Sequence, residues 1–161
     1  AKRPATRREV SPVAGRALNL AIVVLLALAA GLKLTLPLSA QRIQAAINQQ
    51  QPVGAIAYLQ ASHPEGALFN SYAWGGYLLW RLWPDYLTFV DGRTDLFAGS
   101  VLDDYVAAWN ATGAWPSVMA KYGIGLALLE QGAPLTNALR AAGWATLYED
   151  PQAVVFANPA E

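Results

Sequence analysis

The longest apolar run of the chain covers residues 17–38, in which Asn19 and Lys33 are the only strongly polar side chains. About 20 apolar residues cross the hydrocarbon core of a bilayer as a helix, because each residue adds about 1.5 Å of rise. The aliphatic stem of Lys33 can extend to the membrane interface, and Pro37 marks the expected end of the helix. The pattern therefore predicts one transmembrane helix at residues 17–38.

A cleaved signal peptide is the alternative for this run, since its uninterrupted apolar core, residues 20–32, is short enough for one. The sequence "LPLSAQ" argues against it, because a cut after Ala40 would have Leu38, which is not small, three places before the bond. We therefore expect the helix to be a retained anchor.

After the anchor, the polar and apolar positions predict a short connector helix over residues 39–51 and a second helix over 52–61 that begins at Pro52. Strands and helices then alternate. The predicted strands are 67–70, 86–90, 124–130, 144–149 and 153–156, and the predicted helices are 71–82, 101–110, 115–121 and 134–142. This order predicts a small three-layer α/β domain with a mainly parallel sheet and an antiparallel hairpin at the C-terminal end.

Charge divides the chain into a basic tail and an acidic body. The tail, residues 1–16, has a net charge of +4, whereas the chain from residue 41 onward has −5. The positive-inside rule places the tail in the cytoplasm and the α/β domain, residues 52–161, outside a bacterial cytoplasmic membrane. An acidic folded part also argues against nucleic-acid binding, which needs a basic face.

The composition excludes several kinds of chemistry. The chain has no cysteine, one histidine (His63) and one methionine (Met119), so thiolate catalysis, iron–sulfur clusters and zinc knuckles are ruled out. His63 lies in "SHPEG", which has the composition of a turn rather than of a catalytic triad. We expect no cofactor and no metal site.

Aromatic side chains concentrate between residues 71 and 83, around the glycine pair Gly75–Gly76. They are Tyr72, Trp74, Tyr77, Trp80 and Trp83. Each glycine within a helix costs roughly 1 kcal/mol relative to alanine, so close packing of this helix on the sheet or on helix 52–61 is the favoured explanation. The rings suit a core or a protein interface best, while a sugar-stacking platform and contact with lipid headgroups remain open.

The sequence "DGRTD" follows a predicted strand at its carboxyl end, where ligands bind in parallel α/β sheets. The favoured interpretation is structural, with Asp91 capping the loop and Arg93 forming an ion pair. Alternatives are a ligand contact through Asp91, Arg93 and Asp95, or a hard-cation site. That cation site would add Asp103 and Asp104, although the spacing matches no calcium loop.

The stretch "NSYAWGGYLLWRLWPDYLTFVDGRTDLF", with "PVGAIAYLQ" before it and "YGIGLALLE" and "WATLYEDPQAVVFAN" after it, carries a family resemblance. It resembles the last span and C-terminal soluble domain of bacterial polytopic membrane proteins of the family 39-type (GT-C) glycosyltransferase group. In such enzymes the catalytic acid lies in the first extracytoplasmic loop. This chain has no such loop, so the resemblance transfers no catalytic residue. We expect the chain to be either a fragment of a longer protein, which the start at Ala1 without methionine fits, or a stand-alone version of the tail.

Two functions are expected from these patterns. The first is a non-catalytic, membrane-anchored accessory subunit of a larger bacterial membrane complex, for instance an electron-transport assembly. Its expected partners are lipid and other integral membrane subunits, and no small-molecule ligand is expected other than a glycan. The second is the C-terminal domain of a lipid-linked-sugar glycosyltransferase that binds glycan or acceptor.

Overall fold

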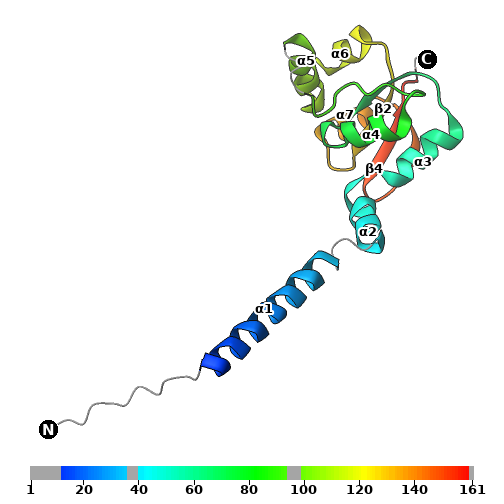
Figure 1. Cartoon of the computed structure of the whole chain (residues 1–161). Coiled ribbons are helices and arrows are strands. Elements are labelled where there is room, and N and C mark those ends of the chain that lie inside the picture. Colours follow the sequence, from blue (N-terminus) through cyan, green and yellow to red (C-terminus); the bar gives the residue numbers. More distant parts are fainter. Residues whose placement is uncertain (1–11, 36–39, 94–98, 160–161) are drawn as a thin grey trace. The chain divides into compact units, whose positions relative to one another are not determined.

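A computed structural model of the chain describes residues 12–35, 40–93 and 99–159 (Figure 1). The chain divides into two compact units, Ala1–Ile47 and Asn48–Glu161.

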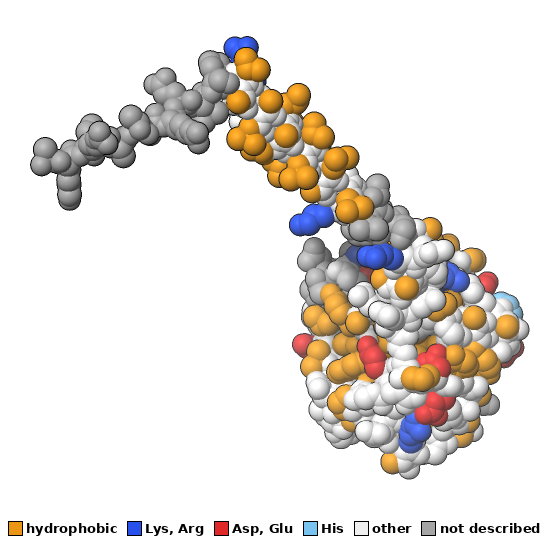
Figure 2. Space-filling model, turned by 90° about the horizontal axis from the view of Figure 1, so that it is seen from below, with side chains coloured by type: hydrophobic (Ala, Val, Ile, Leu, Met, Phe, Trp, Pro, Cys, Tyr) orange, Lys and Arg blue, Asp and Glu red, His pale blue; other side chains and the backbone are white. Residues whose placement is uncertain are grey.

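The first unit contains helix α1 (Pro12–Thr35) and most of helix α2 (Ala40–Gln50). Within α1, Val13–Lys33 has a mean hydropathy of 2.1 and is not buried, so it is long and apolar enough to span a membrane. Figure 2 shows apolar side chains along α1. A signal sequence would pass the same test, so this helix alone does not separate the two interpretations. The helix begins five residues earlier than predicted, and positions 36–38 lie outside the described residues.

The second unit is built on a four-stranded sheet in the order β1-β2-β4-β3. Its strands are β1 (Ala67–Asn70), β2 (Ile124–Glu130), β3 (Ala145–Glu149) and β4 (Ala153–Ala157). β1 pairs with β2 in parallel, whereas β4 is antiparallel to both β2 and β3. The C-terminal hairpin is confirmed. The prediction of a mainly parallel sheet was wrong, because the sheet is mixed and has one parallel pair among these strands.

The segment predicted as a strand at residues 86–90 explains part of this difference. It forms a single parallel bridge, between Leu68 and Thr88, instead of a ladder. Beyond that bridge, the buried side chain of Asn70 forms the hydrogen bonds to this segment. Its Oδ1 accepts from Phe89 N at 2.7 Å, and its Nδ2 donates to Val90 O at 2.9 Å. A side-chain amide thus replaces strand pairing and holds the segment beside β1.

The helices of this unit match the predicted positions closely. They are α3 (Val53–Ser62), the 3₁₀ turn η1 (Tyr72–Trp74), α4 (Gly75–Leu82), α5 (Ser100–Trp109), α6 (Trp115–Lys121) and α7 (Pro134–Ala141). The predicted helix 71–82 is divided into η1 and α4, so Gly75 begins a helix rather than lying in its middle.

Two clusters of buried side chains stabilise the unit. Because neighbouring residues of a strand point to opposite faces, β2 supplies both clusters in alternation. Ala127 and Leu129 pack with residues of α5, α6 and α7, while Leu126 and Leu128 pack with residues of α3 and α4. This explains why β2 reads as a continuous apolar run that ends in Glu130.

Candidate functional site

A pocket lies where the parallel strands β1 and β2 both end. Ser71 N, just after β1, still donates to Leu128 O at 3.1 Å, and the chain then leaves the sheet as η1. β2 continues for two more residues to Glu130. Since parallel strands end at the same edge, Ser71 and Glu130 come together there, at the edge where α/β sheets bind ligands.

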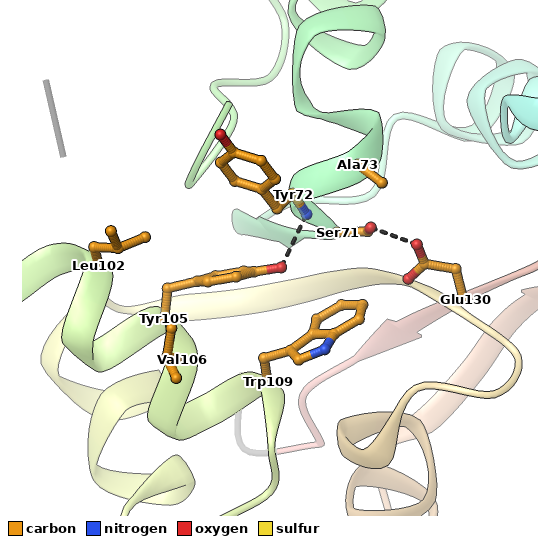
Figure 3. Close-up of a pocket in the computed structure, with 8 residues that line it drawn as sticks. All are labelled: Ser71, Tyr72, Ala73, Leu102, Tyr105, Val106, Trp109 and Glu130. Atoms are coloured by element: carbon orange, nitrogen blue, oxygen red, sulfur yellow. Dashed lines mark hydrogen bonds between the residues drawn. The ribbon is translucent and has the colours of Figure 1, made fainter. Parts of the chain in front are cut away.

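Helix α5 supplies the opposite wall. Leu102, Tyr105, Val106 and Trp109 follow the spacing of one helix face and line the pocket together with Ser71, Tyr72, Ala73 and Glu130 (Figure 3). The Tyr105 and Trp109 rings stack at 5.8 Å, and Tyr105 also stacks on Phe69 of β1 at 5.3 Å. The cavity has a volume of about 400 Å³, near the lower end of the range for small-molecule sites.

Two hydrogen bonds order the polar side of the pocket. The Ser71 hydroxyl donates to Glu130 Oε1 at 2.6 Å, and Tyr72 N donates to the Tyr105 hydroxyl at 2.9 Å. The second carboxylate oxygen, Glu130 Oε2, is buried and has no hydrogen-bond partner among the described residues. Burial raises the pKa of the Tyr105 hydroxyl, and the charge of Glu130 adds to this rise. Tyr105 therefore keeps its proton at neutral pH.

The structure separates the five predicted aromatic residues into different surroundings. Tyr72 lines the pocket. Trp74 is buried and donates from Nε1 to Gln50 O at 3.0 Å, while Tyr77 is half-buried. Trp80 and Trp83 are 72% and 63% exposed. The five rings therefore do not form one platform.

Asp91 and Arg93 form the structural pair that the sequence favoured. Asp91 is buried, and its Oδ2 lies 2.5 Å from Arg93 Nη2, while Oδ1 accepts from Arg93 N at 2.9 Å. The hydrogen bond from the Arg93 side chain lowers the pKa of Asp91. Neither residue lines the pocket described above.

The remaining acidic candidates do not join this pair. Asp104 binds Lys121 Nζ at 2.6 Å and the Tyr122 hydroxyl at 2.8 Å. Asp103 is exposed on α5, and Asp95 lies outside the described residues. Within the described ranges, no three His, Asp or Glu side chains gather in a way that could hold a metal ion.

The two adjacent glycines, Gly75 and Gly76, differ in what surrounds them. A Cβ built on Gly75 would meet Val90 O at 2.3 Å and Asp91 Cα at 2.6 Å, so α4 packs its backbone directly on this segment. This is close packing as predicted, but the neighbour is the 90–91 segment, which belongs neither to the four-stranded sheet nor to helix 52–61. A Cβ on Gly76 would meet nothing within 4 Å. The packing explanation therefore fails for Gly76.

Sequence reasoning missed the residues that build the pocket: Ser71, Leu102, Tyr105, Val106, Trp109 and Glu130. One signal was present, since Glu130 is a carboxylate placed directly after the apolar run "IGLALL". The spacing of Leu102, Tyr105, Val106 and Trp109 was a second signal, but it is equally typical of a helix face that packs on a core.

No protein-family model, curated protein or solved structure matches this chain. The resemblance to the tail of GT-C glycosyltransferases therefore rests on the quoted residues alone. The structure defines the class of protein as a mixed α/β domain that follows an apolar helix in the chain.

Proposed function

We propose that this chain is a non-catalytic, membrane-anchored subunit whose α/β domain lies outside the cytoplasm and docks onto other integral membrane proteins. The exposure of Trp80 and Trp83 carries this proposal. The chain has six tryptophans, and the other four are buried or half-buried. Large exposed aromatic side chains are typical of protein interfaces and of the membrane–water boundary.

The surroundings of Trp80 support a docking role. Arg81 Cζ lies 5.8 Å from the Trp80 ring centroid and 5.7 Å from that of Tyr77, and Arg81 Nη1 donates to the Tyr77 hydroxyl at 2.8 Å. Trp, Tyr and Arg are the residue types that dominate binding energy at interfaces. Because these three side chains already hold one another, binding orders fewer free rotamers. We call Tyr77, Trp80, Arg81 and Trp83 the Trp80 surface.

The anchor supports a partner in the membrane rather than in solution. Only 18 residues separate Lys33, at the end of the apolar stretch, from Pro52, so a domain that follows an inserted helix stays near the bilayer. The two buried clusters that share β2 support a three-layer domain, which is a compact base for such a surface.

Co-purification from native membranes tests this proposal. The tagged full chain should recover integral membrane partners, and a Trp80→Ala/Trp83→Ala double variant should lose them at an unchanged melting temperature. Truncating an interface hot spot costs about 2 kcal/mol or more, which is roughly thirtyfold in affinity. Val106→Ser, at another exposed apolar side chain, is the matched control and should keep the partners. Partners that survive the double substitution would contradict the proposal.

A second candidate is the C-terminal domain of a lipid-linked-sugar glycosyltransferase that binds glycan or acceptor. The aromatic pocket at the ends of β1 and β2, with its single carboxylate, favours it. The mass of the native protein separates the two candidates, since a chain several times longer supports the glycosyltransferase.

A further inference from the structure

Arg81 differs from the other basic residues of the second unit in having no acidic partner within the described ranges. Residues 48–161 contain four basic and ten acidic residues, so carboxylates are plentiful in this part of the chain. The three other basic side chains each form an ion pair. The pairs are Arg93–Asp91, Lys121–Asp104 and Arg140–Glu149. A guanidinium that pairs with none of the described carboxylates is free to bind an acidic group of another molecule.

Aromatic side chains hold the Arg81 guanidinium in one orientation. Nη1 donates to the Tyr77 hydroxyl at 2.8 Å, and Cζ lies over the rings of Tyr77 and Trp80, whose centroids are 5.7 Å apart. The backbone at this position is held as well, because Arg81 O accepts from Gln60 Nε2 at 2.8 Å.

The remaining donors of Arg81 have the geometry that binds a carboxylate. Within the part of the chain that the structure describes, its Nε and Nη2 donate to no acceptor. These two nitrogens form a planar fork that matches the two oxygens of a carboxylate. Arg93 binds Asp91 through the same two nitrogens, so the chain itself contains an example of this pairing.

A partner that covers the Trp80 surface would also remove Arg81 from water. Arg81 is already half-buried, whereas Trp80 and Trp83 are 72% and 63% exposed. A molecule that packs on the two tryptophans therefore also covers the guanidinium that lies against the Trp80 ring. Because a buried charge without a counter-charge is costly, that molecule must supply an anionic group at this point.

The charge of the domain favours a protein carboxylate over the phosphates of a lipid surface. Sites for anionic lipid contain roughly four to eight Lys or Arg side chains. The second unit offers one guanidinium without an acidic partner among its described residues, and its acidic residues outnumber its basic ones. An anionic bilayer surface would repel such a domain, whereas a single carboxylate matches a single fixed guanidinium.

We propose that the membrane partner of this chain places one Asp or Glu side chain against Arg81, in an extracytoplasmic segment whose neighbouring side chains are apolar or aromatic. The proposal rests on the docking function and adds the chemistry of the partner to it. Arg81 binds the carboxylate through Nε and Nη2, while Trp80 and Trp83 pack on the apolar side chains beside it. The ion pair makes docking selective, because a surface without the carboxylate would bury Arg81 unpaired.

Carbodiimide coupling in native membranes tests for the carboxylate. In the full chain with Arg81→Lys, a water-soluble carbodiimide joins the introduced amine to a carboxylate in contact with it. The product is an amide, and the carbodiimide takes up the water that is released. Mass spectrometry should find the peptide that contains residue 81 joined to an Asp or Glu of an integral membrane protein. Arg140→Lys is the matched control and should give a link within the chain only, because its neighbour is Glu149.

Substitutions measure how much the ion pair contributes to binding. Arg81→Gln should weaken binding of that partner about thirtyfold or more, as loss of one member of a buried charge pair does, and Arg81→Glu should abolish it. Arg140→Gln, at an arginine with a partner in its own chain, should bind as the unaltered chain does. Melting curves identify a variant that fails to fold, and the coupling in Arg81→Lys then decides.

The outcomes separate this proposal from the docking function. If Trp80→Ala/Trp83→Ala loses the partner while Arg81→Gln keeps it, the docking function stands and the carboxylate is contradicted. If both variants keep the partner, the docking function itself is contradicted. The carboxylate proposal is also overturned by a link from residue 81 to a second copy of this chain, by a link to a lipid headgroup, or by no link at all.

Discussion

Gly75 and Gly76 are adjacent in the chain and differ in what faces them. Gly75→Ala would place a methyl group against backbone atoms, with Val90 O at 2.3 Å, and backbone cannot move aside cheaply. We expect a loss of stability of about 3 kcal/mol, at the upper end for overpacking. Gly76→Ala is the matched control and should stabilise α4 by about 0.5–1 kcal/mol, because alanine favours helices. Urea unfolding of both variants measures this. Equal effects at the two positions would contradict the packing described here.

The Asp91–Arg93 pair predicts how the stability of the protein depends on pH. Arg93 lowers the folded-state pKa of Asp91 below 3.8, the ordinary pKa of an aspartate. The contribution of Asp91 to stability is therefore fully present above about pH 3.8. The contribution is lost as the pH falls below that value and through the lowered folded-state pKa. The melting temperature of the unaltered chain should therefore fall more steeply below about pH 4 than that of Asp91→Asn. Asp103→Asn, at an exposed residue, should follow the unaltered chain. Parallel curves for all three proteins would mean that the Asp91–Arg93 pair adds nothing.

At the scale of elements, Asn70 determines how segment 86–90 joins the sheet. Its amide bonds to the backbone of Phe89 and Val90, and Nδ2 also donates to Ser71 O at 2.8 Å. Asn70→Asp keeps the shape but replaces the donor by an acceptor. The Val90 carbonyl then loses its side-chain donor, whereas Ser71 O keeps its hydrogen bond from Trp74 N at 3.2 Å. We expect a loss of about 1–3 kcal/mol for the one unsatisfied carbonyl.

Hydrogen exchange measures the hold on this segment directly. In Asn70→Ala, which removes the acceptor Oδ1 as well as the donor Nδ2, the amides of Phe89 and Val90 should exchange faster, while those of β2 change only as far as global stability falls. Asn110→Ala is the matched control, because the Asn110 amide bonds to Val106 O at 2.9 Å at the exposed C-terminal end of α5. Unchanged protection at Phe89 and Val90 would show that another contact holds the segment.

At the scale of the whole molecule, the charge asymmetry predicts the orientation of the anchor. In sealed, right-side-out vesicles, protease should cleave the chain after residue 41 and spare the tail of residues 1–16. Replacing Lys2, Arg3, Arg7, Arg8 and Arg16 by glutamine should produce a mixture of orientations, because the basic residues set the direction. Vesicles opened with detergent show that both parts can be cleaved. Cleavage of the tail in sealed vesicles would reverse the proposed topology.

Much of the fold could be predicted because its signals are local. The bounds of β1, β2 and α6 match the predicted ranges, since apolar runs and turn residues mark them in the sequence. The candidate site was predicted less well. Asp91 and Arg93 lie two residues apart, so their pairing could be expected, whereas Ser71 and Glu130 are 59 residues apart and meet only through strand pairing.

The sequence by itself determined the apolar helix, the charge asymmetry, the absence of cysteine chemistry and, apart from segment 86–90, the order of helices and strands, because each depends on composition or on neighbouring residues. The tertiary structure decided what depends on distant partners. It placed β4 between β2 and β3 and so made the sheet mixed. It also left Trp80 exposed while burying Trp74, and it brought Tyr105 opposite Glu130. Burial and contact between distant segments follow from the packing of the whole domain, and no local pattern contains them.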